Sequence, residues 1–156
     1  MTILTRFKWF LWYFGKINVP MIGYLRPRLI KLTDSEIVIK LRLSRRSKNH
    51  LHSMYFAALA TGADLAGGLH GFYHARQANV KLSLAFKSFK AQFLKRAETD
   101  VYFICEMGNE VLAMITESKQ SGLRINKAIS VKAYTHYPNE PIEVASFVLE
   151  LSLKVI

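Results

Sequence analysis

Alternation of apolar and polar residues marks the β-strands in the first half of the chain. Residues 37–43 alternate isoleucine and leucine with largely basic side chains, and together with residues 27–32 they flank the turn sequence TDS. This arrangement predicts a half-buried hairpin. Residues 80–86 alternate in the same way, and Phe89 and Phe93 extend the pattern beyond one irregularity, which predicts a long strand.

The second half of the chain continues with strands and one short helix. The strand VYFICEM ends at Gly108, and a helix is expected over residues 110–120, before Gly122. Two long strands, 127–137 and 143–155, are joined by the turn sequence PNEP. With 156 residues and no internal repeat, the chain is expected to form a single domain.

Between these groups of strands lies a stretch that is apolar on every side and predicts a buried helix. The helix is expected from about Ser53 to Leu69, with Gly67, Gly68 and Gly71 closing it. One buried helix between a hairpin and four later strands predicts an α+β fold, in which a curved antiparallel sheet wraps around a long central helix.

Residues 1–24 are expected to form an extra aromatic helix and a connection ahead of the core at residues 25–156. Lys16 interrupts their apolar run and Pro20 breaks the helix, so no stretch reaches the roughly 20 apolar residues that a membrane span needs. Two interpretations stay open: the helix caps the core of its own domain, or residues 3–16 lie on a membrane surface, where Trp and Tyr beside Lys and Arg are typical.

The composition excludes a disordered chain, because 51% of the residues are apolar and 21% are charged. The net charge of +11 favours anionic partners such as acidic lipid, nucleic acid or a phosphorylated cofactor. The basic residues are scattered and form no known base-reading motif, so nucleic acid is not expected. Cys105, the single cysteine, has no intramolecular disulfide partner, which predicts a cytoplasmic protein with contact to the inner membrane surface left open.

Asp64 is the only charged residue between Met54 and Gly68. An unpaired carboxylate in an apolar helix is costly, so its presence indicates a functional role. The structural alternative is a carboxylate that caps a neighbouring segment or pairs with a buried arginine.

Histidines near Asp64 offer a metal-binding hypothesis. His50 and His52 would share a face if extended, and His70 and His74 would share one in a helix, so with Asp64 they supply transition-metal ligands. Their spacing matches no closed zinc pattern, and no metal site is predicted.

The spacing of Asn49 and Asp64 resembles that of hotdog-fold proteins of the acyl-CoA thioesterase superfamily, particularly its poorly characterised bacterial thioesterase-like branch. In phenylacetate-pathway and 4-hydroxybenzoyl-CoA type thioesterases, an Asn or Gln precedes the catalytic Asp or Glu by fifteen positions, as Asn49 precedes Asp64 here. Those enzymes donate a backbone N–H to the thioester oxygen from a glycine seven positions after the amide residue, where this chain has Phe56. Tyr55 stands where many members have histidine.

The resemblance implies a thioester hydrolase with Asp64 as base or nucleophile, Asn49 positioning the water or the carbonyl, and the Phe56 N–H donating to the oxyanion. Any residue except proline supplies such an N–H, so Phe56 leaves this role intact while it crowds the acyl pocket. Ser83 lies near the place where related enzymes put an assisting hydroxyl. The resemblance also implies a homodimer or homotetramer with sites formed between chains.

The implied substrate is an acyl-CoA or an acyl-carrier thioester, so that CoA enters as part of the substrate and no separate cofactor is expected. Basic side chains are candidate contacts for its phosphates, although each has a solvated surface as its alternative. These candidates are Arg45, Arg46, Lys48, Lys87, Lys90 and Arg124. The alternative function, which the residues at 55 and 56 favour, is a non-catalytic hotdog protein that binds acyl-CoA or acyl chains.

Overall fold

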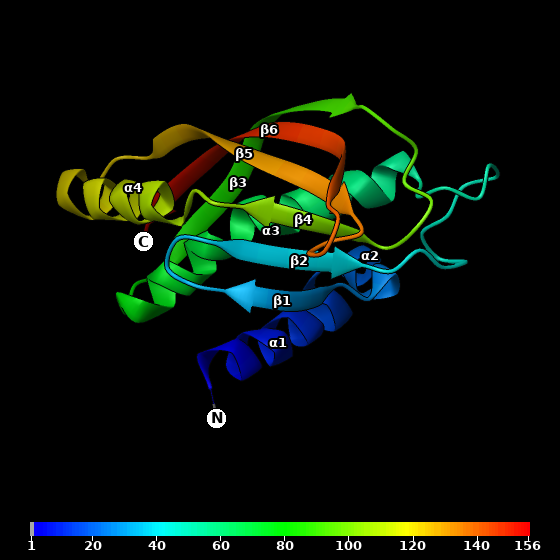
Figure 1. The fold of residues 1–156 in the computed structure, drawn as a ribbon. Helices are drawn as coiled ribbons and strands as arrows, with labels where there is room; N and C mark the ends of the chain where they lie inside the picture. The colour runs from blue at the N-terminus through cyan, green and yellow to red at the C-terminus, as the bar shows by residue number, and fades with distance from the viewer. Residues whose placement is uncertain (1) are drawn as a thin grey trace.

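The computed structural model describes residues 2–156 and confirms an α+β architecture (Figure 1). Six antiparallel strands form one sheet in the order β1-β2-β4-β5-β6-β3. The strands are β1 (Arg28–Leu32), β2 (Ile37–Leu41), β3 (Leu82–Phe93), β4 (Val101–Cys105), β5 (Ile125–Thr135) and β6 (Ile142–Val155). The helices are α1 (Ile3–Tyr13), the π-helix η1 (Phe14–Asn18), α2 (Pro20–Leu25), α3 (Phe56–Gln77) and α4 (Gly108–Ser121).

The strand predictions are confirmed within a few residues of their ends. Strands β1 and β2 pair as the expected hairpin, and β5 and β6 pair along most of their length, from Ile125 opposite Leu153 to Thr135 opposite Ile142. The irregularity in β3 is a shift of register between Phe86 and Ser88. Alternation predicted strands such as β4 and β5 well because they bury one face and leave the other more exposed.

The central helix α3 begins at Phe56, three residues later than predicted. The side-chain oxygen of Asn49 accepts hydrogen bonds from the N–H of Leu51 (2.9 Å) and of Ser53 (3.2 Å), and so holds the preceding residues in a turn. Local side-chain bonding of this kind competes with helix formation.

The predicted end of this helix near Leu69 is wrong, because α3 continues to Gln77. The glycines taken as a helix end lie inside the helix, where they let it approach the sheet. A Cβ atom on Gly71 would lie 2.5 Å from the Leu84 side chain, and one on Gly68 would touch the Phe86 ring at 3.4 Å. Close packing against the sheet therefore overrides the low helix propensity of glycine.

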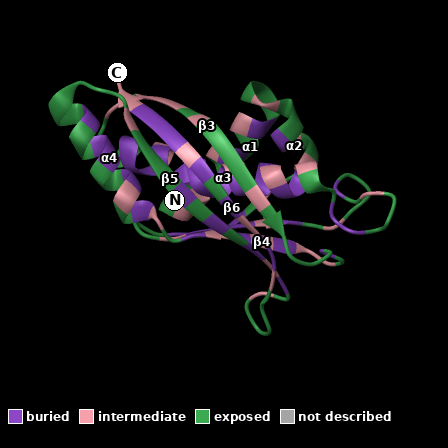
Figure 2. Cartoon of the chain, turned by 90° about the horizontal axis from the view of Figure 1, so that it is seen from above, coloured by how far each residue is buried: buried purple, intermediate pink, exposed green. Residues whose placement is uncertain are grey.

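The hydrophobic core lies between α3 and the inner face of the sheet (Figure 2). Inward-facing residues such as Phe103, Phe147 and Leu151 are almost fully buried. Strands β1 and β3 are the two edges of the sheet, and β3 is largely exposed along its twelve residues.

The N-terminal segment packs beside α3 and β1 through Phe7, Leu11 and Ile22, which confirms the extra N-terminal helix. The helix ends ahead of Pro20, as expected, but Pro20 then opens a second short helix, α2, where its fixed backbone angle is favourable. Among the helices of residues 2–156, none combines the length and the apolar character needed to cross a membrane.

Candidate active site

Asp64 lines an apolar pocket between the N-terminal helices, the central helix and strand β3. The pocket has a volume of about 220 Å³. Its walls are Phe10, Leu11 and Phe14 from the N-terminal helices, Leu65, Gly68, Leu69 and Phe72 from α3, and Leu84, Ala85 and Phe86 from β3. Asp64 is the only ionisable side chain among them.

The carboxylate of Asp64 is half-buried, and no hydrogen bond or ion pair to it is found in residues 2–156. It therefore neither caps a neighbouring segment nor pairs with a buried arginine. Burial raises the pKa of the Asp64 carboxyl above its ordinary value of 3.8, because the charged form loses hydration without gaining a partner. A carboxylate in this state accepts a proton more readily than an exposed one.

A second group of predicted residues gathers at the N-terminus of α3. Asn49, Tyr55 and Phe56 belong to the loop and first turn that enter this helix. The Asn49 oxygen is engaged within the loop, where it also accepts from the Ser53 hydroxyl at 3.3 Å. Its amide nitrogen has no acceptor within the described residues.

The Phe56 N–H is the first of the helix, and no acceptor for it lies within residues 2–156. The partial positive charge of a helix N-terminus makes such a group suited to an oxyanion. The Phe56 side chain is 58% exposed and contacts the rings of Tyr55 (4.8 Å between centroids) and Phe93 (6.4 Å). Eight residues separate Phe56 from Asp64 on one helix, which places them about 12 Å apart along its axis.

The structure does not bring Ser83 to Asp64. Leu82 and Leu84 face α3, so Ser83 between them lies on the outer face of the sheet. There its hydroxyl accepts a hydrogen bond from the Arg124 guanidinium at 2.7 Å, and Arg124 also reaches the Ser152 carbonyl at 3.3 Å. Arg124, predicted as a phosphate contact, is thus engaged within the chain.

The other predicted phosphate contacts are exposed. Arg45 and Lys48 lie in the loop before α3, and Lys87 and Lys90 lie on β3. Arg46 is held by α2, since its guanidinium lies 5.3 Å from the centre of the Tyr24 ring and donates to the Tyr24 carbonyl at 3.3 Å.

His70 and His74 pack against the β1–β2 turn. Their rings stack with centroids 5.6 Å apart, and each Nε2 bonds a carbonyl of the β1–β2 turn, of Thr33 at 3.2 Å and of Asp34 at 3.0 Å. Burial lowers the pKa of His70 to about 4 and also lowers that of His74. Within residues 2–156, no group of three His, Cys, Asp or Glu side chains is arranged to hold a metal ion.

Acidification is expected to destabilise the protein through this histidine pair. The folded state binds a proton at His70 less tightly than the unfolded chain does. The contribution of neutral, buried His70 to the stability of the fold is therefore complete above pH 6.5 and is lost as the pH falls toward 4. Between pH 7 and pH 5 the contribution of His70 to the free energy of unfolding should fall by about 2 kcal/mol, measured by urea denaturation of the wild type and of His70→Gln. His70→Gln keeps a donor for the Thr33 carbonyl without titrating, so a fall of the same size in this variant would contradict the assignment.

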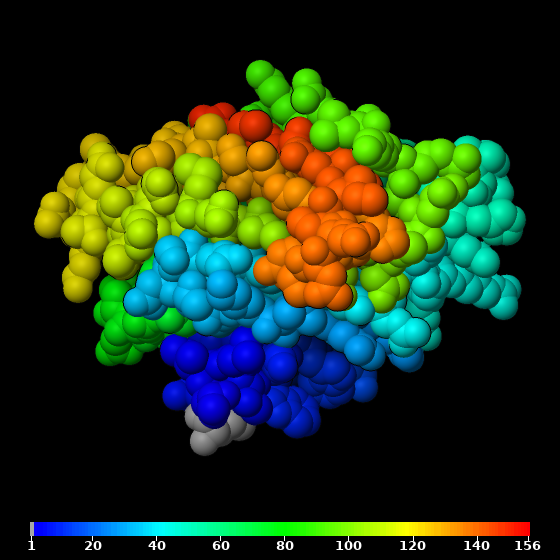
Figure 3. Space-filling view, viewed as in Figure 1, coloured from blue at the N-terminus to red at the C-terminus, as the bar shows by residue number. Residues whose placement is uncertain are grey.

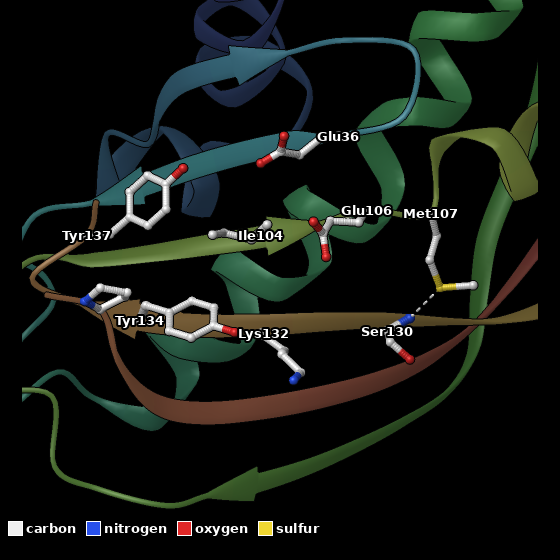
Figure 4. Close-up of a pocket in the computed structure, with 9 residues that line it drawn as sticks. Glu36, Ile104, Glu106, Met107, Ser130, Lys132, Tyr134 and Tyr137 are labelled. Atoms are coloured by element: carbon white, nitrogen blue, oxygen red, sulfur yellow. Dashed lines mark hydrogen bonds between the residues drawn. The ribbon is translucent and has the colours of Figure 1, made fainter. Parts of the chain in front are cut away.

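The outer face of the sheet carries a separate groove of about 400 Å³, over β2, β4 and β5 (Figure 4). Its charged side chains are largely paired within the protein, Glu36 with Lys31 and Lys132 with Glu143 at 3.8 Å. None of the predicted catalytic residues lines it.

Sequence reasoning missed the wall of the pocket that the N-terminal helices provide. Phe7, Phe10 or Leu11, and Phe14 recur at the three- and four-residue spacing of one helix face, which was the available signal. The sequence does not show which segment packs against that helix face, because Asp64 lies fifty residues further along the chain.

Several solved structures share this fold at low sequence identity. A protein of unknown function from Chlorobaculum tepidum TLS matches with a TM-score of 0.83 at 10% identity, over 97% of this chain and 96% of that one. A Pseudomonas aeruginosa protein of unknown function, named a probable thioesterase, matches at 0.79 and 16%, over 100% and 99%. A thioesterase from Haemophilus influenzae matches at 0.69 and 11%, over 99% and 92%.

These likenesses confirm the hotdog fold that the sequence resemblance predicted. A comparison with curated proteins finds no match. A family model described as a domain of unknown function, DUF4442, matches residues 8–146, and because this span is most of the chain, the protein belongs to that family.

Proposed function

We propose that this protein hydrolyses acyl thioesters and that Asp64 is the general base. The observation that carries the proposal is the Asp64 carboxylate, which lies without a partner beside an apolar pocket on the central helix. Keeping an unpaired carboxylate there costs stability, and the raised pKa suits a group that must take up a proton. The name of the Haemophilus influenzae neighbour, a thioesterase, supports the same chemistry.

In the proposed reaction, Asp64 removes a proton from a water molecule while the water oxygen attacks the thioester carbonyl carbon. The carbonyl oxygen becomes an oxyanion, which a backbone N–H stabilises. As the intermediate collapses, the carbon–sulfur bond breaks and the proton held by Asp64 passes to the departing thiolate. The products are a carboxylic acid and a free thiol, and no cofactor is consumed.

We assign the oxyanion donor to the Phe56 N–H, since it is unbonded and lies at the positive end of a long helix. In this proposal the amide nitrogen of Asn49, which has no acceptor within the described residues, holds the carbonyl or the water, and the exposed Tyr55 ring lies beside Phe56. Ser83 has no part in this proposal, because Arg124 occupies its hydroxyl on the other face of the sheet.

We propose that a complete site is formed by two copies of the chain. Phe56 and Asp64 are about 12 Å apart along the axis of one helix, so we propose that the Phe56 N–H and the Asp64 carboxylate that act on one carbonyl group come from different chains. Strand β3 is an open edge, and antiparallel pairing of two β3 strands about a twofold axis would set the two α3 helices side by side. Phe56 of one copy would then approach Asp64 of the other, and the exposed Phe89 and Phe93 rings would be covered.

The carrier of the acyl group is proposed to be a phosphopantetheine thiol, as in CoA or an acyl carrier protein. Arg45 and Lys48 are exposed in the loop that leads to the Phe56 N–H, and no ion pair holds them within residues 2–156. Their charge suits the phosphates of such a carrier.

The test is thiol release from a series of acyl-CoA thioesters of increasing chain length. Because the acyl chain is proposed to lie in the Asp64 pocket, the rate should be highest at one chain length and should fall for longer chains. Phe14→Ala removes part of the pocket wall, and the optimum should move to longer chains. Tyr13→Ala is the matched control, because this neighbouring ring is exposed and does not line the pocket.

Hydrolysis with the same optimal chain length in the wild type and in Phe14→Ala would support the proposed reaction. It would exclude the Asp64 pocket as the acyl site. An absence of turnover on every thioester, in protein shown to be folded, would refute the hydrolase. Saturable binding of acyl-CoA without turnover would then support the alternative of a non-catalytic acyl-binding protein, to which the aromatic pair Tyr55 and Phe56 points.

A further inference from the structure

The surface of the N-terminal helices carries positive charge only. Residues 2–33 contain six Lys and Arg side chains and no Asp or Glu, and the first carboxylate of the chain is Asp34. All six cations are exposed, and only Lys31 is ion-paired within the described residues. They are Arg6, Lys8, Lys16, Arg26, Arg28 and Lys31.

The same surface carries large apolar side chains that face water. Trp9 is 61% exposed and Met21 is 66% exposed, although the opposite side of these helices is buried through Phe7 and Leu11. A helix that is apolar on both sides ordinarily has a partner on both. The outward residues are Trp9, Trp12, Tyr13, Ile17, Met21 and Tyr24. We call the exposed side chains of residues 2–31 the N-terminal face, which forms one end of the molecule (blue in Figure 3).

Cations and aromatic rings are interleaved on the N-terminal face. The Lys16 ammonium lies 4.9 Å from the centre of the Trp12 ring, and the Trp12 and Trp9 rings meet edge to face at 5.7 Å. Beside them a groove of about 880 Å³ runs between the N-terminal helices and β1. Its cationic lining is Lys8, Lys16, Arg26, Arg28 and Arg46, and its lining contains no carboxylate.

We propose that the N-terminal face docks on the surface of a membrane that contains anionic phospholipid. Charge complementarity selects an anionic partner, and two copies of this face would repel each other. A lipid surface accepts both kinds of side chain at once, because phosphate headgroups pair with Lys and Arg while Trp, Tyr, Ile and Met enter the boundary of the acyl chains. Nucleic acid offers no comparable place for Ile17 and Met21.

Docking would set the Asp64 pocket close to the lipid surface. Helix α1 exposes Trp9 and Trp12 on one side, while Phe10 and Leu11 line the pocket on the other. Docking of this kind does not depend on hydrolysis by Asp64.

The chain has its own reporter for this contact, since its two tryptophans, Trp9 and Trp12, both lie on the N-terminal face. The full chain is mixed with vesicles of phosphatidylcholine, with or without phosphatidylglycerol, and binding is followed by tryptophan emission and by vesicle flotation. We expect a blue shift and co-flotation with the anionic vesicles, both weakened by added salt. Inorganic phosphate without vesicles should not shift the tryptophan emission.

Two double variants with the same net charge separate this face from the charge of the whole protein. Lys8→Glu with Lys16→Glu should lower the vesicle partition coefficient by at least about fivefold for each cation lost. Lys119→Glu with Lys127→Glu alters exposed lysines of α4 and β5 and should have little effect. Equal loss in both double variants, or no binding of the wild type, would overturn the proposal. So would concentration-dependent self-association that Trp9→Ser abolishes, because a second copy would then cover this face.

Discussion

Replacement of Asp64 by asparagine is expected to lower the rate of thioester hydrolysis by roughly 10²- to 10⁴-fold, the usual contribution of a general base. The same substitution is expected to raise the melting temperature at neutral pH. Asparagine keeps the shape of the side chain and removes a charge that burial holds without a partner. Loss of activity together with a gain of stability is what a residue kept for function should show.

The sign of the stability effect follows from the direction of the pKa shift. The folded state holds the proton of Asp64 more tightly than the unfolded chain, so its stabilising contribution is present at low pH and is lost as the pH rises through the folded pKa. The advantage of Asp64→Asn should therefore be present at pH 7 and should shrink toward pH 4, where the wild-type carboxyl is increasingly protonated. Thermal unfolding of both proteins at the two pH values measures this.

Asp100→Asn provides a control for which the expected change in stability at pH 7 has the opposite sign. Asp100 is paired with Lys40 at 2.9 Å and accepts the Leu43 N–H at 2.9 Å, and these contacts hold its pKa below the ordinary value despite partial burial. Its substitution should destabilise the protein at pH 7 and leave hydrolysis nearly unchanged. Unaltered turnover in Asp64→Asn would remove Asp64 from the mechanism, whatever its effect on stability.

Two glycines of the central helix should respond in opposite ways to alanine. A Cβ atom on Gly62 would lie 2.3 Å from ring atoms of Phe103, a fully buried side chain that cannot move aside without disturbing Phe147. Gly62→Ala should therefore lower the free energy of unfolding by about 1–3 kcal/mol. At Gly67 the new methyl would make ordinary contacts at 3.6 Å and beyond, so Gly67→Ala should stabilise by up to about 1 kcal/mol through helix propensity.

Urea denaturation of the two variants gives the comparison directly, provided that the slope of the transition is unchanged. A third protein tests the cause: in a Phe103→Leu background, the added cost of Gly62→Ala should be smaller, because the two sites are in contact and their effects are coupled. Equal changes at Gly62 and Gly67, or additive effects with Phe103→Leu, would show that helix propensity and not the Phe103 ring decides the outcome.

Most of the sheet could be predicted from the sequence because apolar and polar residues alternate along most of its strands. The alternation in residues 37–43 and the repeated leucines before Val155 are properties of consecutive residues, and they predicted β2 and β6 with errors of one or two residues at the ends. The shift of register in β3 was also visible, as a break in the same pattern.

The length of the central helix depended on the sheet that covers it. Gly67, Gly68 and Gly71 resemble a helix end when only their neighbours in sequence are considered. In the folded chain, Phe86 and Leu84 pack against this stretch, and the helix continues through it to Gln77. Packing between distant segments thus decided an element that local propensity could not.

The candidate site could also be predicted only in part from the sequence. The sequence by itself determined that Asp64 is an isolated charge on a buried helix, since composition and periodicity are local. Only the tertiary structure decided that the carboxylate has no partner in residues 2–156, that Phe10 and Phe14 enclose it, and that Ser83 faces the other side of the sheet. Contacts between positions far apart in the sequence depend on how helices and strands pack around a common core, and no pattern of consecutive residues contains that information.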